Sequence, residues 1–124
     1  ALPSLTKARR IQEKAAGVGF DWDNVDNVFD KIYEELDELK DALKSKQKNK
    51  IQDELGDVLF SIVNLSRHID CDPESSLSRS TNKFIDRFQL LEKYMVSKKL
   101  NFSDQSLSEL DLLWNKIKAK LSAN

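Results

Sequence analysis

Apolar residues recur at steps of three and four through most of this chain, and this spacing constrains the fold more than any other feature. It is the spacing of one face of an α-helix, which has about 3.6 residues per turn. Residues that interrupt helices are few, with 3 Gly and 2 Pro among 124 residues. No segment alternates apolar and polar residues as a half-buried strand does. The sequence therefore predicts an all-α helical bundle with short connections, forming a single domain over residues 1–124.

Capping and turn residues divide this pattern into helices. Ser4 is an expected N-cap of the first helix, and Asn24 or Asp23 of the second. Asp72 followed by Pro73 is typical of a helix start, and Ser106-Leu107-Ser108-Glu109 is a capping box. We expect a loop at 17–24 and helices at about 4–16, 25–45, 50–70, 73–96 and from 107 onward.

The charge balance limits the classes of partner. Acidic and basic residues nearly cancel, with a formal net charge of -1, so a generic nucleic-acid or anionic membrane surface is not favoured. A small phosphate-bearing ligand is compatible, because its site needs only a few local cations. The single cysteine, Cys71, excludes an internal disulfide and fits a reducing compartment. With no long apolar run and no signal-peptide pattern at the start, we expect a cytoplasmic protein.

Two of the expected helices carry matching acidic motifs, Glu35-Leu36-Asp37-Glu38 and Glu54-Leu55-Gly56-Asp57. With the leucine at the centre of each apolar stripe, the first carboxylate lies about 100° to one side and the second about 60° beyond it. Gly56 would permit close approach of the two helices. Antiparallel packing would bring four carboxylates to one cleft: Glu35, Glu38, Glu54 and Asp57.

Four clustered carboxylates repel one another strongly unless a cation lies among them. Oxygen ligands favour magnesium or manganese over zinc or copper, and such ions usually leave positions for water and substrate phosphates. Either motif alone is more typical of a solvated helix face with local ion pairs. Because both motifs have the same offsets from their apolar stripes, a metal site and a solvated helix face are equally supported.

Cationic and aromatic residues share two further helix faces. Lys83 and Arg87 are four residues apart, as are Trp114 and Lys118. A Lys/Arg pair can hold phosphate oxygens and Trp can cover a base or sugar. The alternative is that the cations extend into solvent and that Trp114 belongs to the core.

The remaining reactive side chains point to no other chemistry. Trp22, with Phe20 in the first loop, either stacks on a base or covers the core. His68 is the only histidine, so neither a nucleophilic triad nor a paired Glu-x-x-His di-iron site can be built. Cys71 has no evident activating partner.

At the acidic motifs the chain resembles the MazG family of nucleotide pyrophosphohydrolases, whose signature is E-E-x-x-E followed by E-x-x-D. Here it reads Glu34-Glu35-Leu36-Asp37-Glu38 and Glu54-Leu55-Gly56-Asp57. Asp53 departs from the Glu that the family often has. The resemblance covers nearly the whole chain and is strongest to the C-terminal domain of two-domain bacterial MazG. Matching stretches are Ala1–Leu5, Val18–Trp22, Gly56–Phe60, Val63–His68, Asn82–Phe88 and Trp114–Lys118.

The resemblance implies magnesium-dependent hydrolysis of (deoxy)nucleoside triphosphates to monophosphate and pyrophosphate, as nucleotide-pool house-cleaning. Manganese could replace magnesium. Relatives restricted to dUTP, dCTP or phosphoribosyl-ATP, and a catalytically silent helical adaptor, are the alternatives. By this likeness Glu35, Glu38, Glu54 and Asp57 bind the metal, and the nucleotide is contacted by Lys83, Arg87, Trp114 and Lys118.

Two further expectations concern catalysis and assembly. Glu35 is expected to orient or deprotonate the water, because it lies closer to the apolar stripe than Glu38. Phe60 and Val63 lie off the main apolar face of the third helix, so that helix has more apolar surface than one stripe needs. Together with the MazG resemblance, this predicts a homodimer, or two dimers paired into a homotetramer, with the last helix closing a site.

Overall fold

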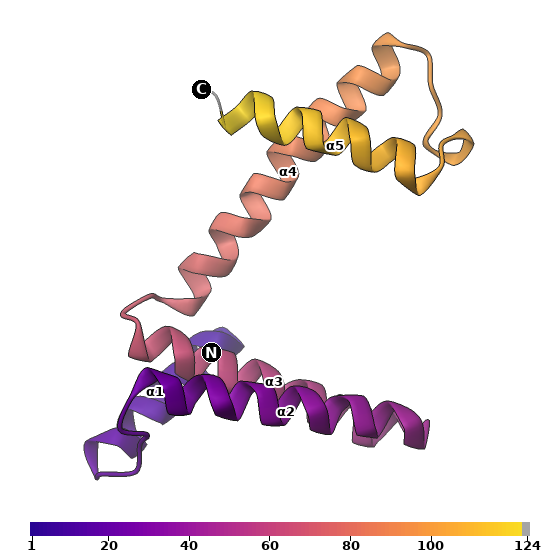
Figure 1. Ribbon diagram of the computed structural model, residues 1–124. Helices are drawn as coiled ribbons and strands as arrows, with labels where there is room; N and C mark the ends of the chain where they lie inside the picture. The colour runs from indigo at the N-terminus through magenta and orange to yellow at the C-terminus, as the bar shows by residue number, and fades with distance from the viewer. Residues whose placement is uncertain (123–124) are drawn as a thin grey trace. The chain divides into compact units, whose positions relative to one another are not determined.

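The computed structural model describes residues 1–122, which are all-helical with no strand among them (Figure 1). The all-α prediction is therefore confirmed for this part of the chain. The third helix begins and ends two residues earlier than the expected 50–70. The elements are α1 (Ser4–Gly17), α2 (Val25–Ser45), α3 (Lys48–His68), α4 (Pro73–Ser97), the short 3-10 helix η1 (Phe102–Asp104) and α5 (Leu107–Ser122).

Side-chain caps begin three of the helices, as the sequence predicts. Asn24, Asp72 and Ser106 each accept a hydrogen bond from the backbone N–H three residues further on, at 2.9–3.1 Å. Each bond satisfies an N–H group that has no partner within its helix. The cap expected at Ser4 is wrong, because α1 begins at Ser4 itself and the preceding Pro3 offers no capping side chain.

The chain forms two compact units, residues 1–76 and residues from Leu77 onward. In the first unit, α2 and α3 form an antiparallel hairpin whose turn contains Lys46 in the left-handed conformation (φ 58°). Helix α1 packs against α3 in the same unit. The single domain expected over residues 1–124 stays a prediction, because compactness within each unit does not test it.

The line of contact on α2 differs from the predicted one. Leu36, the expected centre of the stripe, is 40% exposed, whereas Glu35 is 6% exposed. Leu55 on α3 is 47% exposed in the same way. The expected stripe centre is thus wrong by one residue, about 100° around the helix. The buried positions are Val28, Ile32, Glu35 and Ala42 on α2, and Val58, Ser61, Val63 and Asn64 on α3.

Two other positions on α3, Val63 and Gly56, also differ from expectation, whereas Phe60 agrees with it. Val63 is 2% exposed, so it belongs to the core rather than to an additional outer surface. Phe60 is half exposed and lines a cavity of the first unit. A Cβ added at Gly56 would meet no heavy atom within 4 Å, so no close helix approach depends on this glycine. Apart from Phe60, the large apolar residues that α3 exposes are Leu55, Leu59 and Ile62, and the exposed Ile69 follows as its C-cap.

The second unit contains a row of aromatic rings. The ring centroid of Phe84 lies 5.1 Å from that of Trp114 and 5.9 Å from that of Phe88. Phe88 continues the row to Phe102, at 5.7 Å. Such offset and tilted pairs bury apolar area in favourable geometry. No described helix combines the length and apolar content that a membrane span requires.

Candidate functional site

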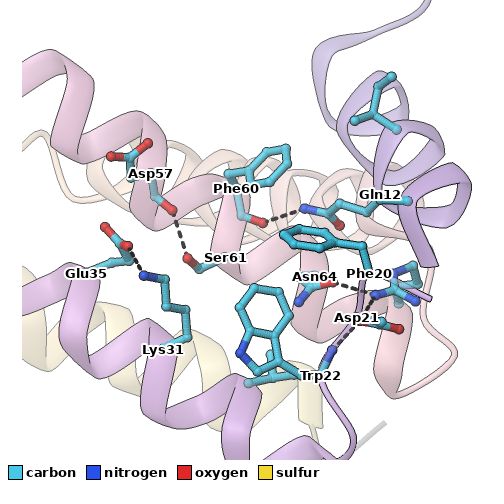
Figure 2. A pocket seen from close by; sticks show the side chains of 14 residues that line it. Gln12, Phe20, Asp21, Trp22, Lys31, Glu35, Asp57, Phe60, Ser61 and Asn64 are labelled. Carbon is cyan, nitrogen blue, oxygen red and sulfur yellow. Dashed lines mark hydrogen bonds and ion pairs between the residues drawn. The ribbon is translucent and has the colours of Figure 1, made fainter. Parts of the chain in front are cut away.

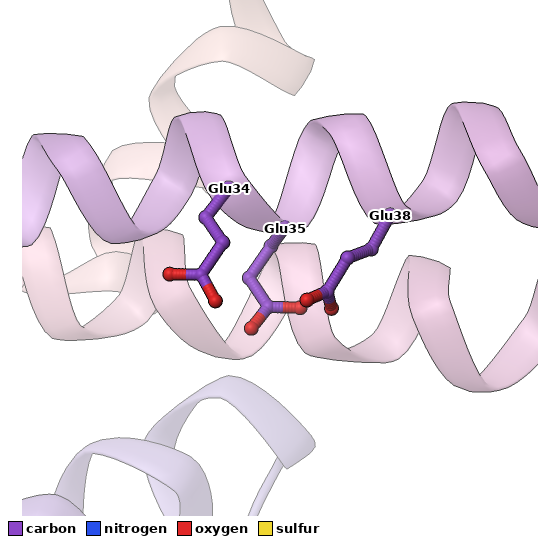
Figure 3. Close-up of side chains that lie close together, drawn as sticks. All are labelled: Glu34, Glu35 and Glu38. Carbon is purple, nitrogen blue, oxygen red and sulfur yellow. The ribbon is translucent and has the colours of Figure 1, made fainter.

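Carboxylates of α2 and α3 converge where the two helices pack. Glu35, Glu54 and Asp57 each offer an oxygen, and these oxygens lie within 4.8 Å of one another. Glu34 and Glu38 lie on either side of Glu35 along α2 and form a second such group with it (Figure 3). The structure therefore brings Glu35, Glu54 and Asp57 together from two helices, and places Glu38 beside Glu35.

The electrostatics of this cluster fit a bound cation. Glu35 and Glu54 each have a buried Oε2 atom without a hydrogen-bond partner anywhere in residues 1–122. Repulsion by Glu35, followed by desolvation, raises the pKa of Glu38 above its ordinary value of 4.5. Buried carboxylate oxygens without partners are costly unless a cation or proton compensates them. Because every donor is a carboxylate, the set suits a hard divalent ion such as magnesium or manganese.

Lys31 already provides one positive charge at the cluster. Its Nζ atom lies 2.8 Å from Glu35 Oε1 and 3.5 Å from Glu34 Oε1. The hydrogen bond to Glu35 is the main cause of a raised Lys31 pKa, so the ammonium form is favoured. Lys31 is not among the site residues predicted from the sequence, although its i,i+4 spacing from Glu35 is a signal for such a contact.

A cavity of about 400 Å³ in the first unit borders the carboxylates. Glu35 and Asp57 belong to its lining, while the aromatic rings of Phe20, Trp22 and Phe60 form much of its wall (Figure 2). Its volume and its mixture of apolar walls with a few polar groups are typical of small-molecule sites. The other lining residues are Ile11, Gln12, Ala15, Asp21, Val28, Lys31, Ser61, Asn64 and Arg67.

Asp21 holds the loop that carries Phe20 and Trp22. Its Oδ1 atom accepts a hydrogen bond from Arg67 Nη2 and lies 3.0 Å from His68 Nε2, at the end of α3. The Arg67 hydrogen bond is the main reason that the Asp21 pKa falls from 3.8 to about 2. A lowered pKa means that this stabilisation is complete above pH 3.8 and is lost as the pH falls through about 2. The loop is thus held by a charged group at neutral pH.

Four of the predicted nucleotide contacts lie in the second unit, whereas the carboxylates lie in the first; these four are Lys83, Arg87, Trp114 and Lys118. Trp114 packs against Phe84, which is adjacent in sequence to Lys83. Lys83 and Lys118 are exposed, and Arg87 is partly buried. Their contact with a nucleotide stays a prediction. Trp22 is 40% exposed and lines the cavity, which agrees with either role considered for it.

Comparison with known proteins gives consistent matches. The MazG nucleotide pyrophosphohydrolase domain matches residues 24–90, which include both acidic motifs. The chain is 46% identical over 117 residues to "Nucleoside triphosphate pyrophosphohydrolase/pyrophosphatase MazG" of Thermotoga maritima, covering 94% of this chain and 45% of that protein. It is 35% identical over 120 residues to "Nucleoside triphosphate pyrophosphohydrolase" of Escherichia coli, covering 95% and 46%. The chain therefore spans about half the length of these curated relatives.

The cluster geometry predicts opposite effects of Glu38→Gln with and without metal. Without metal the variant should melt at a higher temperature than the wild type, because a repelled carboxylate is removed. This gain should vanish below pH 4.5 and grow as the pH rises through the raised pKa of Glu38. With magnesium, the rise in melting temperature that the ion causes should shrink. Asp37→Asn, an exposed position on the same helix, is the control. An undiminished magnesium effect in Glu38→Gln would contradict the assignment.

The Asp21 contact predicts that Asp21→Asn loosens the loop. The neutral amide loses the charge-assisted bond to Arg67, so cleavage by chymotrypsin after Phe20 or Trp22 should become roughly tenfold faster. Mass spectrometry of timed digests identifies the cleaved bond. Asp23→Asn changes an exposed residue of the same loop in the same way and should leave the rate as in the wild type. Equal rates for the two variants would refute a fixing role for Asp21.

Proposed function

Because this chain belongs to the MazG family of nucleotide pyrophosphohydrolases, we propose that it hydrolyses nucleoside triphosphates to monophosphate and pyrophosphate. The observation that carries the proposal is the junction of a carboxylate cluster with a cavity. Glu35 and Asp57 belong to both, so a ligand in the cavity would extend its charged end to the carboxylates. A nucleotide has this polarity, with a planar base at one end and phosphates at the other.

We propose that Glu35, Glu38, Glu54 and Asp57 hold magnesium, which manganese could replace. The unpartnered Oε2 atoms of Glu35 and Glu54 support this set, because a divalent ion would satisfy both. When bound, the ion supplies positive charge to the phosphate oxygens and to the attacking water.

Glu35 is the residue that we propose to orient the water that attacks the α-phosphorus. Its Oε1 atom is held by Lys31. Its Oε2 atom has no hydrogen-bond partner in the described chain, and the lone pair of Oε2 that does not face the ion would accept the hydrogen bond from the water. The water oxygen forms a bond to the α-phosphorus, the bond from that phosphorus to the bridging oxygen breaks, and the carboxylate accepts the proton of the water. Pyrophosphate departs with the bridging oxygen.

Cations near the phosphates would balance the developing charge. Lys31 is placed for this role, because it lines the cavity and touches Glu35. We also propose three phosphate contacts in the second unit, Lys83, Arg87 and Lys118. Trp114 would contact the sugar or base, and Trp22 the base. We further propose a cytoplasmic house-cleaning role on (deoxy)nucleotides, with which the free Cys71 is compatible.

Self-association is the second part of the proposal. Helix α2 exposes Phe29, Tyr33, Leu36 and Leu43, at steps of four, three and seven residues. Helix α3 with its C-cap residue Ile69 repeats these steps through Leu55, Leu59, Ile62 and Ile69, all of which are exposed. Such stripes are typical of helices that pack against further helices, and two hairpins would complete a four-helix arrangement. We therefore propose a homodimer built on these stripes, with pairing into a homotetramer as an extension.

The reaction predicts where a label from water should appear. In H₂¹⁸O with magnesium, ³¹P NMR should find the ¹⁸O in the nucleoside monophosphate and not in pyrophosphate, because attack is on the α-phosphorus. Glu35→Gln should lower kcat by about a hundredfold or more, with Asp37→Asn as control. Label in pyrophosphate, or release of diphosphate with inorganic phosphate, would rule out this reaction. A silent adaptor would give no magnesium-dependent turnover at all.

The exposed stripes predict that Leu59→Lys shifts the protein toward monomer. Association of two copies would bury the stripe, and a lysine in its middle would then lose its hydration. Light scattering after size exclusion at micromolar concentration measures the mass. Val18→Lys, at an 85% exposed apolar residue outside the stripes, should leave the oligomer intact. A wild type that is already monomeric, with a mass near 14.3 kDa, would contradict the proposal.

A further inference from the structure

Two buried amide side chains line the cavity and have no role in the reaction proposed above. Gln12 of α1 is 7% exposed and Asn64 of α3 is 6% exposed. Both lie toward the end of the cavity that holds Phe20, whereas Glu35, Lys31 and Asp57 lie toward the other end (Figure 2). Buried polar groups away from a reaction centre usually have hydrogen-bond partners.

Existing hydrogen bonds determine how both amides are oriented. Gln12 Nε2 donates to the backbone oxygen of Phe60 at 2.9 Å, which leaves Gln12 Oε1 as the remaining acceptor. Asn64 Oδ1 accepts from Arg67 Nη2 at 2.7 Å, which leaves Asn64 Nδ2 as the remaining donor. Arg67 is itself held by Asp21. Neither amide can rotate without breaking a bond.

The remaining acceptor is also unsatisfied. Gln12 Oε1 is buried and has no hydrogen-bond partner within the part of the chain that the structure describes. A buried carbonyl oxygen without a hydrogen-bond donor is costly, so we expect a ligand to supply the donor at this position. The Arg67 bond leaves Asn64 Nδ2 as a free donor, although this atom is not fully buried without a partner as Gln12 Oε1 is. The cavity thus offers one fixed acceptor and one fixed donor.

The walls around these amides suit a flat ring. Phe20, Trp22 and Phe60 present aromatic surface to the cavity. Aromatic side chains stack on planar heterocycles, and the ring edge then faces polar groups beside them. A base has an N–H donor next to a ring or carbonyl acceptor on its edge, which complements the two free amide groups.

On the premise of the proposed function, we propose that Gln12 is a specificity-determining residue that reads the hydrogen-bonding edge of the nucleobase. Gln12 Oε1 accepts an N–H of the base, and Asn64 Nδ2 donates to the acceptor beside it. The site then takes nucleotides whose base keeps that N–H and rejects those in which the nitrogen is methylated. A site built around a hydrogen bond rejects an analogue lacking it more strongly than an apolar pocket rejects a change of size.

Binding of monophosphates tests this without requiring turnover. Calorimetry in magnesium would compare deoxycytidine monophosphate with its N4,N4-dimethyl analogue, and thymidine monophosphate with its 3-methyl analogue. The wild type should bind the unmethylated nucleotide roughly tenfold or more tightly in at least one pair. Gln12→Met keeps the length of the side chain but removes the acceptor, so that preference should fall to within about twofold of parity. Gln89→Met, at an exposed glutamine of α4, should keep the wild-type preference.

The preference ratio separates recognition from a structural role. If Gln12 only supports the fold through its bond to Phe60, Gln12→Met weakens both members of a pair equally and the ratio persists, which overturns the inference. A wild type that does not discriminate in either pair overturns it as well, even if Gln12→Met fails to fold. Absence of pyrophosphate release from every triphosphate, with the ratio intact, would instead refute the proposed reaction and leave base recognition standing.

Discussion

The packing of α2 against α3 buries the carboxylate of Glu35 where an apolar side chain would pack more favourably. The site depends on the burial of this carboxylate. Glu35 is on the same buried line as Val28, Ile32 and Ala42. Once Glu35 is buried there, helix geometry brings Glu38 one turn further along α2, and the packing of α3 brings Glu54 and Asp57 to the same place. Burial of such charges is tolerated only when cations compensate them, and Lys31 supplies one. The negative charge that Lys31 leaves uncompensated makes the cluster suitable for a divalent ion.

The cavity beside the carboxylates adds a shaped binding space to this charged cluster. Its two ends differ in chemistry, with carboxylates and Lys31 at one end and Phe20 with two amides at the other (Figure 2). Different elements supply the second end: α1 provides Gln12, the following loop provides Phe20, and α3 provides Asn64. Asp21 links that loop to α3 through Arg67. Membership of the MazG family and this polarity both support the proposed ligand, a nucleotide lying along the cavity.

Helices α2 and α3 each have two apolar faces, and this explains why the predicted stripe centre was wrong. A broad apolar surface shows where a helix can pack but not which part meets its own chain. In this unit, the lines through Glu35 and Val58 are buried, while the stripes through Leu36 and Leu59 stay exposed. The outer stripes form the surface that we assign to a second copy. The same hairpin would therefore supply both the proposed metal ligands and the proposed surface for self-association.

The sequence by itself determined the features that depend on neighbouring residues. Helical spacing and caps at Asn24, Asp72 and Ser106 act within one turn, so they predicted the all-α fold and most helix boundaries. The equal offsets within the two acidic motifs likewise predicted carboxylates that meet across two helices, because those offsets are properties of each helix alone.

Only the tertiary structure decided which apolar face is buried, and with it the burial of Glu35 and Val63 and the irrelevance of Gly56 to helix approach. It also decided that Gln12 meets Phe60, 48 residues away, and that Asp21 meets Arg67, 46 residues away. Such pairs are set by how α1, the loop and α3 pack together. No local spacing encodes them, because their contact depends on the path of the whole unit rather than on the turn of one helix.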